Sequence, residues 1–221
     1  MLILSEIRKH FGATRALDGV TLEVRPGRVH ALVGENGAGK STLMNVLAGG
    51  LSPDGGEMTM EGRAYRPSGP LEAREAGVAL IHQELSLCDH LTVAENILLG
   101  REPRRGGRYD RRAATAEAAR VLEPFHHPEL HPDRTVADLP IAARQVVEIC
   151  RAVSADARVV LMDEPTSSLP REDVDRLFAL IGRLRANGVA VVYISHFLEE
   201  VRALADDITV LRDGRTVWTG T

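Results

Sequence analysis

The amino-acid sequence predicts an α/β protein with a mainly parallel sheet and a helical insert. Two apolar runs carry this expectation, because residues 29–33 lead into a glycine-rich loop and residues 159–162 lead into two carboxylates. Short apolar runs bounded by turn signals are typical of strands buried on both faces, as they are in parallel sheets. The pattern becomes helical over residues 85–155 and then returns to alternating strands and helices, which indicates an insert within one sheet.

Turn residues and hydrophobic periodicity predict the order of the elements. The first part should comprise strands within 2–8 and 20–33 with a turn at 25–28, a helix from Lys40 ended by Gly49-Gly50, a turn at 52–56, a short strand at 57–62, a short helix at 71–77 and a strand at 78–83. The insert should comprise helices at 92–100, at 111–125 and from near Arg144 through Ile149, with an exposed arginine-rich loop at 101–110. The last part should comprise the strand before Asp163, a helix at 171–186, a strand at 189–195, a helix near 197–204 and a final apolar stretch at 207–218.

Composition excludes several classes of protein. The chain has 221 residues, 44% of them hydrophobic, and a formal net charge of −4, so it can bury a core and has no overall attraction to nucleic acid. Cys88 and Cys150 form no close pair and show no metal-ligand spacing, which favours a reduced cytosolic interior. Because no run approaches the roughly 20 apolar residues of a membrane helix, any membrane role is expected to be peripheral.

Residues 34–41 read GENGAGKS and fit the phosphate-binding pattern G-x4-G-K-[ST], with Thr42 following. Glycines let backbone N–H groups approach phosphate oxygens, and the helix that begins at the loop points its positive dipole end at the anion. Lys40 adds a point charge for the β- and γ-phosphates, and the Ser41 hydroxyl can bind Mg²⁺. A chance glycine turn is the alternative, but the loop lies between a predicted strand and a predicted helix, as the motif requires.

Polar side chains follow three other predicted strands. Asp163 and Glu164 end one strand, where Asp163 would hold Mg²⁺ and Glu164 would orient or deprotonate an attacking water. Gln83 and His196 end two more strands, and such residues are more often structural when they stand alone. All these groups should lie at the same edge of a parallel sheet, where ligands bind in open α/β folds. The sequence therefore predicts one phosphate-binding site there.

These motifs and their order resemble the nucleotide-binding domain of ABC ATPases over essentially all 221 residues. The resemblance implies a P-loop NTPase fold, an ABC-type ATPase core with an antiparallel β lobe and an inserted helical subdomain at about 85–155. It implies that ATP is bound by Phe11, stacked on the adenine, and by Gly34, Glu35, Asn36, Gly37, Ala38, Gly39, Lys40, Ser41 and Thr42. It also implies that Mg²⁺ is held by Ser41, Gln83 and Asp163, and that the catalytic residues are Glu164, His196 and Gln83. Pro170 departs from the family, in which an aspartate is usual at this position.

Several longer stretches of the sequence narrow the resemblance to the N-terminal half of the tandem ATPase subunits of bacterial monosaccharide importers. The stretches VALIHQEL and ENILLGRE are its most specific parts. By this resemblance, roughly residues 85–105 dock on a membrane permease at the cytoplasmic face of the cell membrane, and a periplasmic or lipoprotein sugar-binding protein takes part indirectly. Such subunits hold two ATPase domains, so the second domain is expected to be absent from these 221 residues.

Residues 139–145, LPIAARQ, stand where ABC domains carry a glycine-containing signature that contacts the γ-phosphate of a partner domain's ATP. We name them the signature segment. Pro140 removes a hydroxyl and an N–H, and a lost hydrogen bond to a charged phosphate costs about 1.5–3 kcal/mol. Pro140 is also suited to start a helix. The hypothesis is that this segment faces a degenerate site, and that ATP hydrolysis needs an asymmetric pair of domains.

The expected function is therefore ATP hydrolysis that drives monosaccharide uptake. An importer ATPase for nucleosides or another small solute is an alternative, and so is a soluble ABC ATPase outside transport. A soluble role in translation or DNA repair would be favoured by a basic RNA-binding surface or a long coiled-coil insertion, and the sequence has neither. A module that binds ATP without turnover is disfavoured by the presence of Glu164 and His196.

Overall fold

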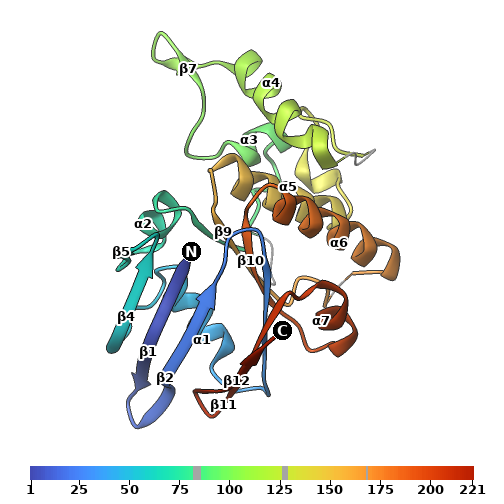
Figure 1. Ribbon diagram of the computed structural model, residues 1–221. Helices are drawn as coiled ribbons and strands as arrows, with labels where there is room; N and C mark the ends of the chain where they lie inside the picture. The colour runs from blue at the N-terminus through green and yellow to red at the C-terminus, as the bar shows by residue number, and fades with distance from the viewer. Residues whose placement is uncertain (82–85, 126–128, 168) are drawn as a thin grey trace. The chain divides into compact units, whose positions relative to one another are not determined.

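The structure is a computed structural model that describes residues 1–81, 86–125, 129–167 and 169–221 (Figure 1). The chain divides into two compact units. The first unit is formed by Met1–Gln83, Ala157–Ser168 and Ile181–Thr221, and the second by Glu84–Asp156 and Leu169–Leu180.

The first unit contains two sheets. The larger has the strand order β12-β11-β3-β10-β9-β6, in which β12 is antiparallel to β11 and the other neighbours are parallel. Its strands are β3 (Val29–Val33), β6 (Val78–Ile81), β9 (Val159–Asp163), β10 (Ala190–Ile194), β11 (Asp207–Arg212) and β12 (Arg215–Gly220). The smaller sheet is antiparallel, with β1, β2 and β4 side by side in Figure 1. Its strands are β1 (Leu2–Phe11), β2 (Thr14–Val24), β4 (Gly55–Met60) and β5 (Arg63–Ala64).

The first unit also contains the helices α1 (Lys40–Leu47), α2 (Pro70–Glu75) and α7 (Leu198–Leu204). One apolar core joins its two sheets through α1, because Leu43 and Leu47 of α1 are fully buried in the same cluster as residues of β1 and β10. Burial of apolar area is the main stabilising contribution to such a fold. The core therefore holds α1, and with it the glycine-rich loop, against the carboxyl edge of the sheet.

The second unit is mainly helical and has its own core. It contains α3 (Val93–Ile97), the short strands β7 (Arg104–Arg105) and β8 (Arg108–Tyr109), α4 (Arg111–Leu122), two single 3₁₀ turns (Glu123–Phe125 and Val136–Asp138) and α5 (Ile141–Ser154). Helix α6 (Arg171–Ala186) contributes residues to both units. Thr92 begins α3 with a capping box, in which its hydroxyl accepts from the Glu95 N–H and the Glu95 carboxylate accepts from the Thr92 N–H. Leu169–Leu180 belongs to this unit although it lies outside the helical insert expected at 85–155.

Several sequence expectations differ from the structure. The strand expected within 20–33, before the turn at 25–28, begins already at Thr14. The helix expected from near Arg144 begins at Ile141, because Pro140 occupies its N-cap with extended backbone. Residues 101–110 are exposed as expected, but they include the β7–β8 hairpin closed by Gly106-Gly107, both with positive φ. The first strand continues to Phe11 and turns back at Gly12, whose φ of 59° suits glycine.

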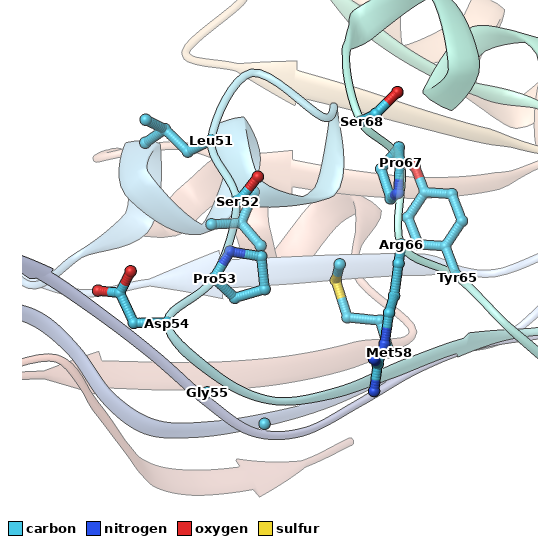
Figure 2. Close-up of a pocket in the computed structure, with 12 residues that line it drawn as sticks. Leu51, Ser52, Pro53, Asp54, Gly55, Met58, Tyr65, Arg66, Pro67 and Ser68 are labelled. Carbon is cyan, nitrogen blue, oxygen red and sulfur yellow. The ribbon is translucent and has the colours of Figure 1, made fainter.

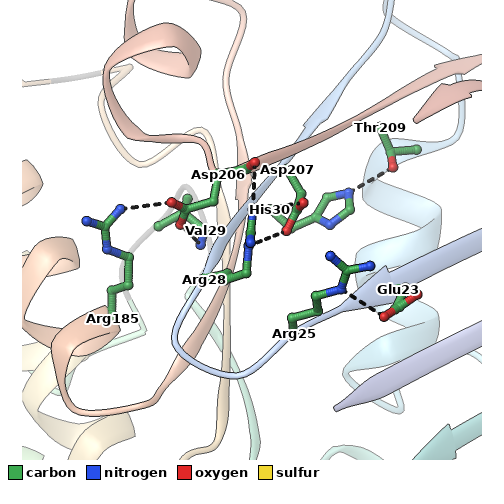
Figure 3. A network of polar contacts seen from close by, with 9 residues as sticks. All are labelled: Glu23, Arg25, Arg28, Val29, His30, Arg185, Asp206, Asp207 and Thr209. Atoms are coloured by element: carbon green, nitrogen blue, oxygen red, sulfur yellow. Dashed lines mark hydrogen bonds and ion pairs between the residues drawn. The ribbon is translucent and has the colours of Figure 1, made fainter. Parts of the chain in front are cut away.

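A polar network fastens β3 to its neighbour β11 (Figure 3). Arg28 donates from Nη2 to the Asp206 carbonyl at 3.0 Å and to Asp207 Oδ1 at 3.1 Å, and its Nε lies 2.7 Å from Asp207 Oδ2. His30, 2% exposed, lies with Nε2 2.8 Å from Thr209 Oγ1. Burial lowers the pKa of His30, so its neutral form is favoured in the fold. This network fixes the strand that leads into the glycine-rich loop.

Among the residues that the structure describes, no helix is long and apolar enough to cross a membrane.

Candidate functional site

The carboxyl ends of three neighbouring strands bring the predicted site residues to one edge of the first unit's large sheet. Ile194 at the end of β10 is paired with Leu32 of β3 on one side and with Asp163 of β9 on the other. The glycine-rich loop follows β3, Glu164 follows β9, and His196 follows β10. Parallel pairing places these three segments together, as the sequence pattern predicts.

The phosphate loop, residues 34–42, is packed so closely that two of its glycines leave no room for a side chain. A Cβ at Gly34 would lie 2.3 Å from the Leu211 carbonyl oxygen. A Cβ at Gly39 would lie 2.6 Å from the Ala16 carbonyl oxygen, and Gly39 has a φ of 102° as the N-cap of α1. Gly214, in the turn between β11 and β12, donates to the Ala38 carbonyl at 3.2 Å. These contacts hold the backbone of the loop in one conformation.

Lys40 is the first residue of α1 and is only 6% exposed. Its Nζ donates to the carbonyls of Gly34 at 2.6 Å and Glu35 at 3.0 Å, so the side chain folds back over the loop. Burial lowers the pKa of Lys40, and the nearby carboxylates of Glu164 and Asp163 act in the opposite direction. The ammonium therefore lies within electrostatic reach of both acidic residues of the site.

The remaining residues of the loop surround Lys40. Glu35, Asn36, Gly37 and Ser41 are exposed, Thr42 is half-buried and Ala38 is buried. Ser41 lies in the first turn of α1, where unbonded N–H groups and the helix dipole favour an anion.

Glu164 and His196 are paired directly. The Glu164 Oε1 and His196 Nε2 atoms lie 2.5 Å apart, with exposed side-chain fractions of 25% and 40%. Glu164 has a positive φ of 48°, held by its N–H, which donates to the Ile194 carbonyl, and by its own carbonyl, which accepts from the Ser167 N–H. A strained backbone at such a position costs about 1–3 kcal/mol and is found most often at functional sites. Asp163, the last residue of β9, is half-buried.

Two predicted residues are not joined to this cluster by described contacts. Phe11 ends β1 and is 49% exposed, and its ring lies 5.8 Å from the Lys9 ammonium. Within the described ranges, no hydrogen bond or ring contact links Phe11 to the phosphate loop. Gln83 lies outside the described residues.

The signature segment belongs to the second unit. Its helix α5 begins at Ile141 with no side-chain cap from Pro140. Arg144 instead binds the chain before the helix, donating to the carbonyls of Leu139 at 3.0 Å and Ala137 at 2.9 Å and pairing with Asp89. Side-chain hydrogen bonds thus hold this helix start.

A surface pocket of about 370 Å³ lies elsewhere in the first unit (Figure 2). It is lined by Val46, Leu51, Ser52, Pro53, Asp54, Gly55, Gly56, Met58, Tyr65, Arg66, Pro67 and Ser68. Val46 belongs to the last turn of α1, whereas the phosphate loop lies at the first turn. The pocket therefore lies at the C-terminal end of α1, where the negative end of the helix dipole disfavours anions. It is separate from the phosphate loop.

One feature of the site is not predicted from the sequence: a carboxylate on α7 accepts hydrogen bonds from the segments that follow β9 and β10. Glu200 accepts hydrogen bonds from Thr166, two residues after Glu164, and from Ser195, one residue before His196. A lone glutamate in a surface-facing helix gives no signal for this role. Only the packing of α7 near the ends of β9 and β10 brings the three side chains together.

Comparisons with known proteins agree on the family. The sequence model described as ABC transporter matches residues 17–167. Ribose import ATP-binding protein RbsA 1 of Rubrobacter xylanophilus is 50% identical over 217 residues, which cover 98% of this chain and 43% of that protein. A putative ribose/galactose/methyl galactoside import ATP-binding protein of Burkholderia cenocepacia is 50% identical over 219 residues, 99% of this chain and 42% of that protein. The chain thus spans less than half the length of these relatives.

The fold has close counterparts among solved structures. A nucleotide-free ATP-binding cassette from an ABC transporter superposes with a TM-score of 0.88 at 28% identity, covering 100% of this chain and 90% of that one. A cassette in its ADP conformation gives the same TM-score at 29% identity with the same coverage. The predicted fold class is therefore confirmed, including the antiparallel sheet that the sequence resemblance implied.

Proposed function

The chain belongs to the ABC transporter family, and on that premise we propose that it binds and hydrolyses Mg-ATP to drive monosaccharide uptake. The observation that carries this proposal is the arrangement at one sheet edge of Lys40, Glu164 and His196. A cationic phosphate loop and a paired carboxylate and imidazole are the groups that ATP hydrolysis requires. The names of the relatives support the solute class.

The residues of the loop suit a nucleoside triphosphate. Backbone N–H groups of the phosphate loop and of the first turn of α1 face the phosphates. When ATP binds, the Lys40 ammonium leaves the carbonyls of Gly34 and Glu35 and donates to phosphate oxygens instead. The proposed position of Phe11 is against the adenine ring. Gln83 is proposed as a further ligand of Mg²⁺ or of the attacking water.

Oxygen atoms of Ser41 and Asp163 fit Mg²⁺, which prefers hydroxyl, carboxylate and water ligands. Ser41 is exposed at the start of α1, and Asp163 acts electrostatically on Lys40, so both belong to the same site. When bound, the ion would neutralise phosphate charge.

Glu164 orients the attacking water and accepts its proton, and His196 donates a hydrogen bond to the γ-phosphate. The 2.5 Å contact between the two side chains is then a resting arrangement that opens toward water and phosphate. General bases of this kind contribute roughly 10²–10⁴-fold to a rate. Hydrolysis adds the water oxygen to the γ-phosphorus and releases ADP and phosphate.

The proposed partners follow from the family. A second ATPase domain would pair head-to-tail with this one, and residues at about 85–105 would contact a permease at the cytoplasmic face of the membrane. A sugar-binding protein would act on the other side, and solute choice would rest with that protein and the permease. The domain itself is proposed to be residues 1–221, with its helical subdomain at about 85–155.

Asymmetric pairing is part of the proposal. The phosphate loop of this chain would work with the signature of the second domain, while the signature segment faces a weaker site. Pro140 supports this assignment, because it offers neither a hydroxyl nor an N–H to a phosphate.

The test is Mg-ATP binding and turnover by the purified chain across a series of protein concentrations. We expect calorimetry to show binding that Lys40→Ala weakens at least roughly tenfold, as loss of a charged hydrogen bond implies. Arg63→Ala supplies a control, since it removes one positive charge at an exposed position of β5. Turnover is expected to be negligible for the chain alone.

Turnover that rises with the square of concentration, and that Glu164→Gln abolishes, would overturn asymmetric pairing but retain the ATPase. Failure to bind Mg-ATP would overturn the proposed function itself.

A further inference from the structure

A single oxygen of Glu200 collects three hydroxyl hydrogen bonds. Its Oε2 accepts from Thr166 at 3.0 Å, from Tyr193 at 2.8 Å and from Ser195 at 2.5 Å. Thr166 lies in the loop after β9, Tyr193 lies in β10 and Ser195 directly follows β10, whereas Glu200 lies on α7. Hydrogen bonds to an ionised carboxylate are about twice as strong as neutral ones. One side chain thus joins three segments of the first unit.

The donors are shielded from water, which makes the arrangement costly to break. Tyr193 is 0% exposed, Ser195 is 4% exposed and Thr166 is 6% exposed. Burial and the bond to Glu200 both raise the pKa of Tyr193, in that order, so the phenol stays a donor. A buried hydroxyl deprived of its acceptor has no water to replace it.

The bond with Ser195 extends around His196. Ser195 Oγ donates to Glu200 and also accepts from the Phe197 N–H at 3.0 Å. The residues before and after His196 are therefore both fixed by one hydroxyl, which is itself fixed by Glu200. The backbone that carries the imidazole has little freedom to turn.

The bond with Thr166 acts on the other partner of the pair. Thr166 lies two residues beyond Glu164 in the loop after β9, and Glu164 itself has a positive φ. Since Glu200 holds both loops at one atom, it sets their separation.

We infer that Glu200 is a positioning residue, which fixes the distance between the Glu164 carboxylate and the His196 imidazole through Thr166 and Ser195. Glu200 acts on this pair through its bonds to Thr166 and Ser195. The inference rests on the proposed function, because ATP hydrolysis is what gives the distance between Glu164 and His196 a role. The distance itself can be tested without measuring turnover.

The test is nitrogen-15 NMR of the His196 ring in the full chain, with the resonance assigned by its loss in His196→Gln. Glu164→Gln gives the reference shift for a broken pair. We expect Glu200→Gln to move the ring resonances in the same direction and to speed exchange of the Phe197 amide by roughly tenfold. Mg-ATP affinity should stay within about twofold, because the phosphate loop is untouched.

Glu199→Gln is the matched control, since Glu199 is the exposed neighbour on α7 and should leave the His196 ring and the Phe197 amide as in the wild type. Ser195→Ala is the second variant, used if Glu200→Gln does not fold. It keeps the Glu200 carboxylate and removes only the Ser195 hydroxyl, which bonds to Glu200 and to the Phe197 N–H. It should produce the same shift of the His196 ring resonances.

The outcomes separate the two proposals. If Glu164→Gln moves the ring resonances but neither Glu200→Gln nor Ser195→Ala does, the positioning role is overturned and the proposed function stands. If exchange quickens throughout β3, β9 and β10 as well, Glu200 serves stability alone and the inference fails. If Glu164→Gln leaves the ring unchanged, the pair does not exist, and the inference fails together with the catalytic assignment.

Discussion

Two helix starts in this chain lie in segments that we propose to face ATP, and they are built in opposite ways. The phosphate loop reaches α1 through glycines, with Gly39 at φ 102° as the N-cap. The signature segment reaches α5 through Pro140, whose φ of −64° is the ordinary value for proline. At the first helix, backbone packs against backbone, whereas at the second, the Arg144 side chain binds the preceding carbonyls.

This difference shows where substitution is tolerated. Gly34 and Gly39 cannot accept even a methyl group, because an added Cβ would lie within 3 Å of a backbone oxygen at each position. A helix start held by a long side chain can change at its N-cap, because the cap itself makes no side-chain hydrogen bond. The departure of the signature segment from a glycine-containing sequence is therefore consistent with a stable fold.

The largest effect is expected from Gly39→Ala. The new Cβ would meet the Ala16 carbonyl oxygen at 2.6 Å and would also have to adopt a positive φ. We expect a loss of about 2–4 kcal/mol in the free energy of unfolding, measured by urea denaturation, and weaker Mg-ATP binding. Gly37→Ala separates the two causes, because Gly37 has a φ of 82° but no atom within 4 Å of its added Cβ. Equal losses in both variants would contradict the packing argument.

A smaller effect is expected from Pro140→Ser. Serine at the N-cap of α5 accepts from the Ala143 N–H, which stabilises a helix by about 0.5–2 kcal/mol. Loss of the rigid proline offsets this by about 0.4–1 kcal/mol, so urea denaturation should show a net change below about 1 kcal/mol. Mg-ATP affinity of the single chain should not change, while turnover at high protein concentration should rise. A stability loss like that of Gly39→Ala would remove the contrast between the two helix starts.

The smallest effect is expected from the titration of His30, which lies in β3, the strand that leads into the phosphate loop. Burial lowers the pKa of His30 below 6.5 in the fold, so the unfolded chain takes up its proton first and stability falls as the pH drops below about 6.5. His30→Gln should flatten this fall, measured as the thermal midpoint between pH 7 and about pH 5. Amide exchange in β3 should respond before that in α5, since His30 belongs to the first unit. An identical pH profile in the variant would exclude His30 as the titrating group.

Local signals predicted most of the elements. Residues 29–33 form β3, the helix at 171–186 is α6 with the same bounds, and the glycine pair at 49–50 follows Ala48, the C-cap of α1. The start of α5 at Ile141 agrees with Pro140 as a helix-starting residue, whereas the apolar repeat alone indicated a start near Arg144. The hairpin in 101–110 was missed because arginines carry no strand signal.

By itself, the sequence determined which residues carry charge, which turns need glycine and which strands lead to polar ends. Those are local properties, because backbone conformation and hydrophobic period depend on near neighbours. Only the tertiary structure decided that Glu164 and His196 meet at 2.5 Å and that Glu200 binds the loops of both. The Glu164–His196 contact joins residues 32 positions apart and the Thr166–Glu200 bond joins residues 34 positions apart, through the pairing of β9 with β10 and the packing of α7. No local pattern encodes contacts over that sequence distance.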